Sequence, residues 1–137
     1  MNTLKVALNH AAEAHAGQMW GDLPYIEHVE RVVRHAGAAL LPGFRTERFD
    51  ELVLDHRILL VAAALHDVVE DTDTPLREIH DRYGERVASL VSAVTATEGN
   101  RRTRHNLTLR QLSIHPEAWL IKLADRKINV MRSWDTR

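Results

Sequence analysis

Four ionisable side chains stand together directly after an apolar segment of this chain. They belong to the run His66-Asp67-Val68-Val69-Glu70-Asp71, which follows the apolar residues 58–65. A helix advances about 100° per residue, so on one continuous helix the four polar side chains fall within about 140° and the apolar ones lie opposite. Burying such groups without partners is costly. A metal ion is a common partner for them, so we expect a metal site on this side of the helix.

The order of the four side chains suggests that two of them bind a metal ion and the other two act on a water or substrate. His66 and Asp67 can reach one metal ion from adjacent positions. Glu70 and Asp71 come one helical turn later, where a metal-bound water or a substrate could lie. The alternative is a buried polar cluster that pairs with Arg or Lys and has only a structural role.

Two other segments carry residues that could complete a metal site. His28 lies in the first turn of an expected helix, and Asp125 and Asn129 share a helix face with Lys122 one turn earlier. By itself, such a His is more often a helix cap and such an Asp more often pairs with Lys or Arg. Together with His66 and Asp67, however, they give two imidazoles and two carboxylates. This ligand set suits Mn²⁺, Fe²⁺ or Mg²⁺ better than structural zinc.

The sequence pattern predicts that all the elements that position these residues are helices. Apolar residues recur at helical spacing almost throughout, Gly17 and Gly84 mark helix ends, and no segment shows the alternation of a convincing strand. We expect an all-α bundle whose central helix, residues 55–70, carries the metal site. The other expected helices cover residues 4–14, 26–36, 75–83, 87–94, 107–113 and 116–131, with a loop or short helix over residues 41–52.

Composition limits the classes of protein that fit. The 137 residues suit one domain, residues 1–137, and the formal net charge of −1 argues against a protein that binds nucleic-acid polymers through a strong basic field. The absence of Cys excludes disulfides, zinc thiolate sites and cysteine nucleophiles. No signal peptide or membrane-length apolar run is visible, so we expect a cytoplasmic protein with no membrane partner.

Several segments together resemble one known family. The sequence is similar to the HD-domain superfamily, specifically the RelA/SpoT-type (p)ppGpp hydrolases and the small alarmone hydrolases. The resemblance covers nearly the whole chain, and the His-Asp-x-x-Glu-Asp element with the later Leu-Ala-Asp is highly specific for this branch. The matching segments, in chain order, are residues 14–18, 24–28, 64–72, 83–84, 94–95, 122–126 and Asn129.

The resemblance implies a function and a set of site residues. It implies a Mn²⁺-dependent pyrophosphohydrolase, with other divalent metals as alternatives, that removes the 3′-pyrophosphate from (p)ppGpp or a related alarmone such as (p)ppApp. Glu70 and Asp71 would position and deprotonate the attacking water. Lys122 and Arg126 flank Asp125 and are candidates for phosphate contacts, and Asn129 would contact the nucleoside. The implied metal ligands are His28, His66, Asp67 and Asp125.

The chain also departs from the family pattern. The loop of residues 19–23 is short and lacks the usual Arg-Lys pair; Trp20 could stack on a base instead, or could only pack the loop onto the body. Members of the family usually continue with further C-terminal helices, and we expect these to be absent or truncated here, because the sequence ends soon after Asn129. Arg101, Arg102 and Arg104 could contact distal phosphates or form a solvated loop.

These departures keep two other functions open. One is an HD-type phosphohydrolase that acts on another nucleotide, and the other is a non-catalytic metal-containing nucleotide-binding module. Release of pyrophosphate would indicate the alarmone hydrolase, and release of orthophosphate would indicate the other phosphohydrolase. Stabilisation by a ligand without product would indicate the binding module. An oligomer is also left open, because Trp119, Leu120 and Leu123 of the last helix could contact either a second subunit or the core.

Overall fold

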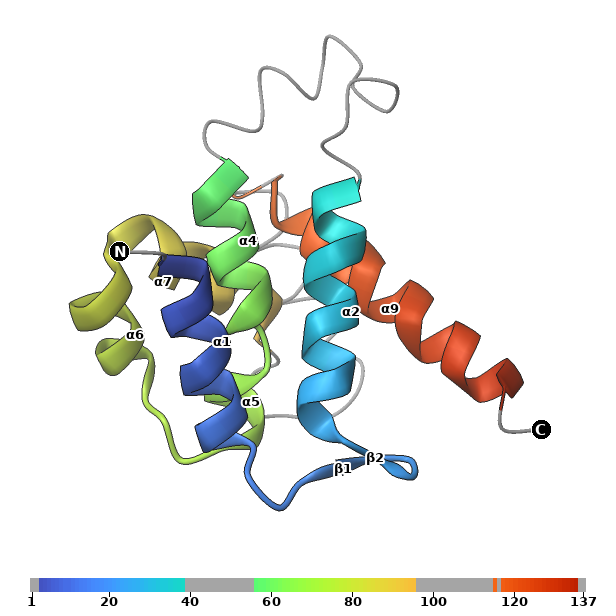
Figure 1. Ribbon diagram of the computed structural model, residues 1–137. Coiled ribbons are helices and arrows are strands. Elements are labelled where there is room, and N and C mark those ends of the chain that lie inside the picture. Colours follow the sequence, from blue (N-terminus) through green and yellow to red (C-terminus); the bar gives the residue numbers. More distant parts are fainter. Residues whose placement is uncertain (1–2, 39–55, 96–114, 116, 136–137) are drawn as a thin grey trace, which may run out of the picture.

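Helices make up nearly all of the described structure (Figure 1), which is a computed structural model that describes residues 3–38, 56–95, 115 and 117–135. The only strands among these residues form one short hairpin, so the expected all-α fold class is confirmed. The helices are α1 (Thr3–Ala14), α2 (Tyr25–Ala38), α4 (His56–Ala64), α5 (Val68–Asp71), α6 (Leu76–Tyr83), α7 (Glu85–Val94) and α9 (Ala118–Asp135).

The helix α4 lies at the centre of the bundle. It packs against α1, α2, α7 and α9, and Figure 1 shows α1, α4 and α2 side by side. Residues 61–64, at its C-terminal end, are all buried, as is Leu65, which follows directly. Side chains that directly follow this buried segment are therefore surrounded by other helices, which explains how one end of α4 can assemble a site from distant parts of the chain.

The central helix is interrupted, which corrects the prediction of one continuous helix over residues 55–70. Helix α4 ends at Ala64, residues 65–67 form a turn, and α5 begins at Val68. The backbone N–H of His66 donates to the carbonyl of Ala63, three residues back instead of four, and His66 Nδ1 lies 2.6 Å from the same oxygen. A side chain inserted into the hydrogen-bond ladder breaks a helix. The turn aims His66 and Asp67 differently from the positions of a regular helix.

A small hairpin precedes α2, although the sequence predicted no convincing strand. β1 (Met19–Trp20) pairs antiparallel with β2 (Leu23–Pro24), and Trp20 lies opposite Leu23. Gly21 has a φ of 64° in the two-residue turn, a conformation that favours glycine. Two-residue strands are too short to show an alternating pattern, so the sequence signal was absent.

The last helix also differs in extent from its prediction, because α9 continues past Met131 to Asp135. Three predicted segments lie outside the described residues: the loop of residues 41–52, the basic residues Arg101, Arg102 and Arg104, and the helix of residues 107–113. None of the described helices is long and apolar enough to cross a membrane.

Candidate metal centre and catalytic pocket

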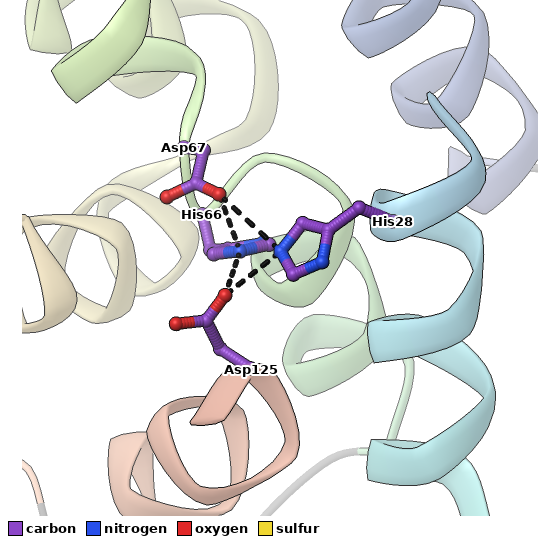
Figure 2. Close-up of side chains that lie close together, drawn as sticks. All are labelled: His28, His66, Asp67 and Asp125. Atoms are coloured by element: carbon purple, nitrogen blue, oxygen red, sulfur yellow. Dashed lines mark hydrogen bonds and ion pairs between the residues drawn. The ribbon is translucent and has the colours of Figure 1, made fainter. Parts of the chain in front are cut away.

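Two imidazoles and two carboxylates converge from three parts of the fold. Figure 2 shows His28 on α2, His66 and Asp67 on the turn between α4 and α5, and Asp125 on α9. One potential ligand atom from each residue lies within 4.8 Å of the others. Residues from three separate elements thus form one compact group of the kind that binds a metal ion.

The distances show which atoms face the centre. His28 Nε2 and His66 Nε2 lie 2.8 and 3.2 Å from Asp125 Oδ1. Asp67 Oδ2 lies 2.8 Å from His66 Nε2 and 3.7 Å from His28 Nε2. Because His66 Nδ1 must donate its proton to the carbonyl of Ala63, Nε2 is the nitrogen left for a ligand.

The electrostatics of the cluster couple its acids to its bases. Burial by itself lowers the pKa of His66, but the carboxylates of Asp67 and Asp125 outweigh burial and raise this pKa to about 10. Burial raises the pKa values of the two carboxyl groups, but their contacts with the imidazoles outweigh it and lower both. Neither Asp pairs with Lys or Arg among the described residues. The alternative of a cluster neutralised by Lys or Arg therefore has no support at these two carboxylates.

Tyr25 links the cluster to a further carboxylate. Its hydroxyl donates to Asp67 Oδ2 at 2.5 Å and lies 3.4 Å from Asp71 Oδ2. Burial and the charge of Asp67 raise the pKa of Tyr25, so the hydroxyl keeps its proton and remains a donor. The ring also packs 5.2 Å from that of His28, between ring centroids. Tyr25 thus fixes the orientation of Asp67.

A polar hollow of about 170 Å³ adjoins this cluster. Asp71 borders it, and burial followed by the charge of Asp67 raises the pKa of Asp71. A carboxylate with a raised pKa is a better proton acceptor near neutral pH than an ordinary one. The lining residues are Tyr25, His66, Asp67, Glu70, Asp71, Val94, Ile121, Lys122, Asp125 and Asn129.

Trp20 lies at the edge of this site. Its Nε1 donates to Asn129 Oδ1 at 3.1 Å, and its ring centroid lies 5.1 Å from that of His28. The indole therefore packs the hairpin against the body of the protein. It also lies beside the group of candidate metal ligands.

The structure brings together nearly all the residues singled out in the sequence. The candidate ligands, Glu70, Asp71, Lys122 and Asn129 share one hollow or its wall, whereas Arg126 lines a separate hollow on α9 with Val130 and Trp134. Because Asp125 and Asn129 line this second hollow as well, Arg126 lies next to the hollow of the candidate ligands and not within it.

Sequence reasoning assigned no role to Tyr25 or to the cations around Trp20. The guanidinium carbons of Arg31 and Arg132 lie 5.2 and 5.3 Å from the indole centroid. Arg132 follows Asp125 by seven residues, a spacing that returns to the same helix face and could have revealed it. Tyr25 lies in the matching segment of residues 24–28, but its type and spacing alone do not indicate the hydrogen bond to Asp67.

Comparisons with known proteins agree with this arrangement. A model of the HD domain matches residues 7–136. Guanosine-3′,5′-bis(diphosphate) 3′-pyrophosphohydrolase of Aquifex aeolicus is 39% identical over 89 residues, which cover 61% of this chain and 13% of that protein. The human enzyme of that name, MESH1, is 33% identical over 136 residues, which cover 90% of this chain and 65% of MESH1. This chain thus spans less than two thirds of the length of either relative.

A solved structure gives the same result for the fold. It is described as a metazoan ortholog of SpoT that hydrolyzes ppGpp and plays a role in starvation responses. It superposes with a TM-score of 0.71 at 29% sequence identity, covering 96% of this chain and 70% of the other.

Proposed function

Because the chain belongs to the HD-domain family, we propose that it is a metal-dependent pyrophosphohydrolase that removes the 3′-pyrophosphate from (p)ppGpp or a related alarmone such as (p)ppApp. The observation that carries this proposal is the group of four metal-ligand candidates beside a hollow lined by further carboxylates. The named activities of the similar proteins support the choice of substrate.

The four candidate ligands suit a divalent metal ion, and we propose Mn²⁺. Two imidazole nitrogens and two carboxylate oxygens form a mixed donor set, which suits a six-coordinate ion with positions left for water and substrate. When bound, such an ion lowers the pKa of a water molecule and offers its positive charge to the phosphoryl oxygens. His28, His66, Asp67 and Asp125 would hold it.

Glu70 and Asp71 would do the proton chemistry. Both line the hollow next to the cluster, and the raised pKa of Asp71 suits a group that accepts a proton from water. Tyr25 would keep Asp67 in place while Asp71 Oδ2 stays within reach of the same hydroxyl. A carboxylate oxygen would thus take the proton of the attacking water.

The remaining residues of the pocket would position the substrate. Lys122 brings a positive charge to a hollow otherwise rich in carboxylates, and Arg126 adds another on the neighbouring surface. Asn129 and Trp20 would contact the nucleoside from the far edge. Water attacks phosphorus, the bond from phosphorus to the 3′ oxygen breaks, and that oxygen gains a proton. The products are pyrophosphate and a nucleotide with a free 3′-hydroxyl.

Product analysis tests this proposal. The Mn²⁺-loaded protein is incubated with ppGpp, with ppApp and with a nucleoside monophosphate, and the products are separated by anion exchange. We expect GDP or ADP together with pyrophosphate. Orthophosphate from the monophosphate alone would support a different HD phosphohydrolase. Ligand-dependent thermal stabilisation without any product would support a binding module.

A further inference from the structure

A third hollow is lined by Trp20, whose Nε1 donates a hydrogen bond to Asn129 of the proposed catalytic pocket. It has a volume of about 330 Å³ and lies between α2 and α9. We call it the basic groove, because cationic side chains form much of its wall. Its lining residues are Trp20, Arg31, Arg34, His35, Ile128, Met131 and Arg132.

The charges of the basic groove are fixed in part by ion pairs. Arg31 Nη1 lies 3.2 Å from Glu27 Oε2, and Arg132 pairs with Asp22 at the tip of the hairpin. These pairs hold two guanidinium groups beside the indole of Trp20. A rim of positioned guanidinium groups is suited to phosphate, whose oxygens match their planar donors.

Two further cations are not neutralised in this way. Arg34 lines the groove and is exposed, with no acidic partner among the described residues. Lys127 on α9 lies close enough to His35 on α2 that, after burial, its charge and that of Arg34 lower the pKa of His35. Positive charge therefore enters the groove from both helices and exceeds the two carboxylates that pair there.

Trp20 lines the basic groove and contacts two residues of the proposed metal centre and catalytic pocket, His28 and Asn129. The indole centroid lies 5.1 Å from the ring centroid of His28, and the guanidinium carbons of Arg31 and Arg132 lie 5.2 and 5.3 Å from it. Asn129, whose Oδ1 accepts a hydrogen bond from Trp20 Nε1, lines the proposed catalytic pocket. A ligand with anionic groups at two ends could therefore reach both hollows by crossing the Trp20–Asn129 pair.

We propose that the basic groove binds the 5′-diphosphate of the nucleotide whose 3′-pyrophosphate lies at the metal centre. This inference rests on the proposed function for the choice of nucleotide. The catalytic pocket is rich in carboxylates and needs a metal ion to accept phosphate, whereas the groove offers guanidinium groups directly. The groove thereby selects nucleotides that carry phosphates at both the 3′ and 5′ positions.

Calorimetric titration of the metal-loaded protein with GDP and with guanosine tests the groove without any turnover. Neither probe carries a 3′-phosphate, so the result does not depend on hydrolysis. We expect wild type to bind GDP more tightly than guanosine. Arg34→Gln should weaken GDP binding about tenfold, because a charge-assisted contact is lost, and should leave guanosine binding at its wild-type value.

Arg77→Gln is the matched control. Arg77 is an exposed arginine on α6, which packs against α7, so the substitution removes the same charge away from the groove. It should bind GDP as wild type does. Equal GDP affinity in Arg34→Gln and wild type would overturn the inference, since the metal centre would then hold the diphosphate. If ppGpp is not hydrolysed but Arg34→Gln still weakens GDP binding, the groove stands and the proposed activity fails.

Discussion

The proposed catalytic pocket and the basic groove both use α2 and α9 but differ in charge, and the pocket is also lined by the turn between α4 and α5, by α5 and by α7. On the catalytic side, α2 supplies His28 and α9 supplies Asp125; about one and two turns later the same helices supply Arg31 and Arg132 to the basic groove. The proposed catalytic pocket is lined by four carboxylates and one lysine and would need a metal ion to bind phosphate, whereas the guanidinium groups of the basic groove would bind it directly. A change of residue type along α2 and α9 would thus separate the proposed chemistry from the proposed recognition.

Burial separates the two regions as well. His28 and His66 are 1% and 3% exposed, while the side chain of Arg31 is 36% exposed. Interactions in the catalytic cluster are therefore strong and demand correct pairing, whereas those of the groove are screened by solvent and salt. Changes at the cluster should have large effects and changes at the groove moderate ones.

The largest effect is expected from removal of a candidate metal ligand. His66→Ala removes one of four metal ligands and should weaken metal affinity by more than about 100-fold. Even mutation of a residue that only hydrogen-bonds to a ligand typically lowers metal affinity about 10- to 100-fold. Metal content after dialysis, measured by elemental analysis, checks this. His80→Ala, at an exposed position on α6, is the control. Full metal content in His66→Ala would remove this residue from the ligand set.

Removal of the proposed proton acceptor should come next. Glu70→Gln keeps the size of the side chain and should lower kcat about 10²- to 10⁴-fold, because a general base is lost. Metal content should stay at the wild-type level, which separates this variant from His66→Ala. Full activity in Glu70→Gln would show that Glu70 does not activate the water.

Tyr25→Phe probes the support of the cluster. It removes only the hydroxyl that donates to Asp67 Oδ2 and should weaken metal affinity about 10- to 100-fold. Competition with a metal-binding dye measures this effect. The ring contacts with His15 and His28 are kept, so the melting temperature with metal in excess should change little. Unchanged metal affinity would reduce Tyr25 to a packing role.

The smallest effect concerns His35 in the basic groove. Burial, Lys127 and Arg34 lower its pKa, because nearby positive charge disfavours the imidazolium. Lys127→Gln should therefore raise the pKa of His35, and bound GDP should raise it in wild type, since negative charge favours the protonated form. A pH titration followed by NMR of the imidazole signals measures both. A pKa that does not respond to GDP would indicate that the diphosphate binds elsewhere.

The sequence predicted the helices and the cluster better than it predicted their connections. The pattern of apolar residues was enough to place α2, α6 and α7 and to single out His66 and Asp67. It could not show that α4 ends at Ala64, because the break depends on the imidazole of His66 reaching a backbone carbonyl. Nor could it predict the hairpin, whose two-residue strands are stabilised by contacts to α9.

The basic groove was hidden for a related reason. Arg31 and Arg34 read as the solvated side of an amphipathic helix, and the short hairpin loop contains no cation. Only the packing of α2 against α9 brings Arg132 and Lys127 to the same place. Charge contributed by distant segments is a tertiary property that local spacing does not reveal.

Steady-state kinetics of wild type, Glu70→Gln and Arg34→Gln on ppGpp, at equal Mn²⁺ loading, test the division between the two hollows most directly. We expect wild type to release pyrophosphate, Glu70→Gln to lower kcat, and Arg34→Gln to raise KM more than it lowers kcat. A wild type that binds metal and releases no pyrophosphate would contradict the account, as would two variants that change the same kinetic parameter.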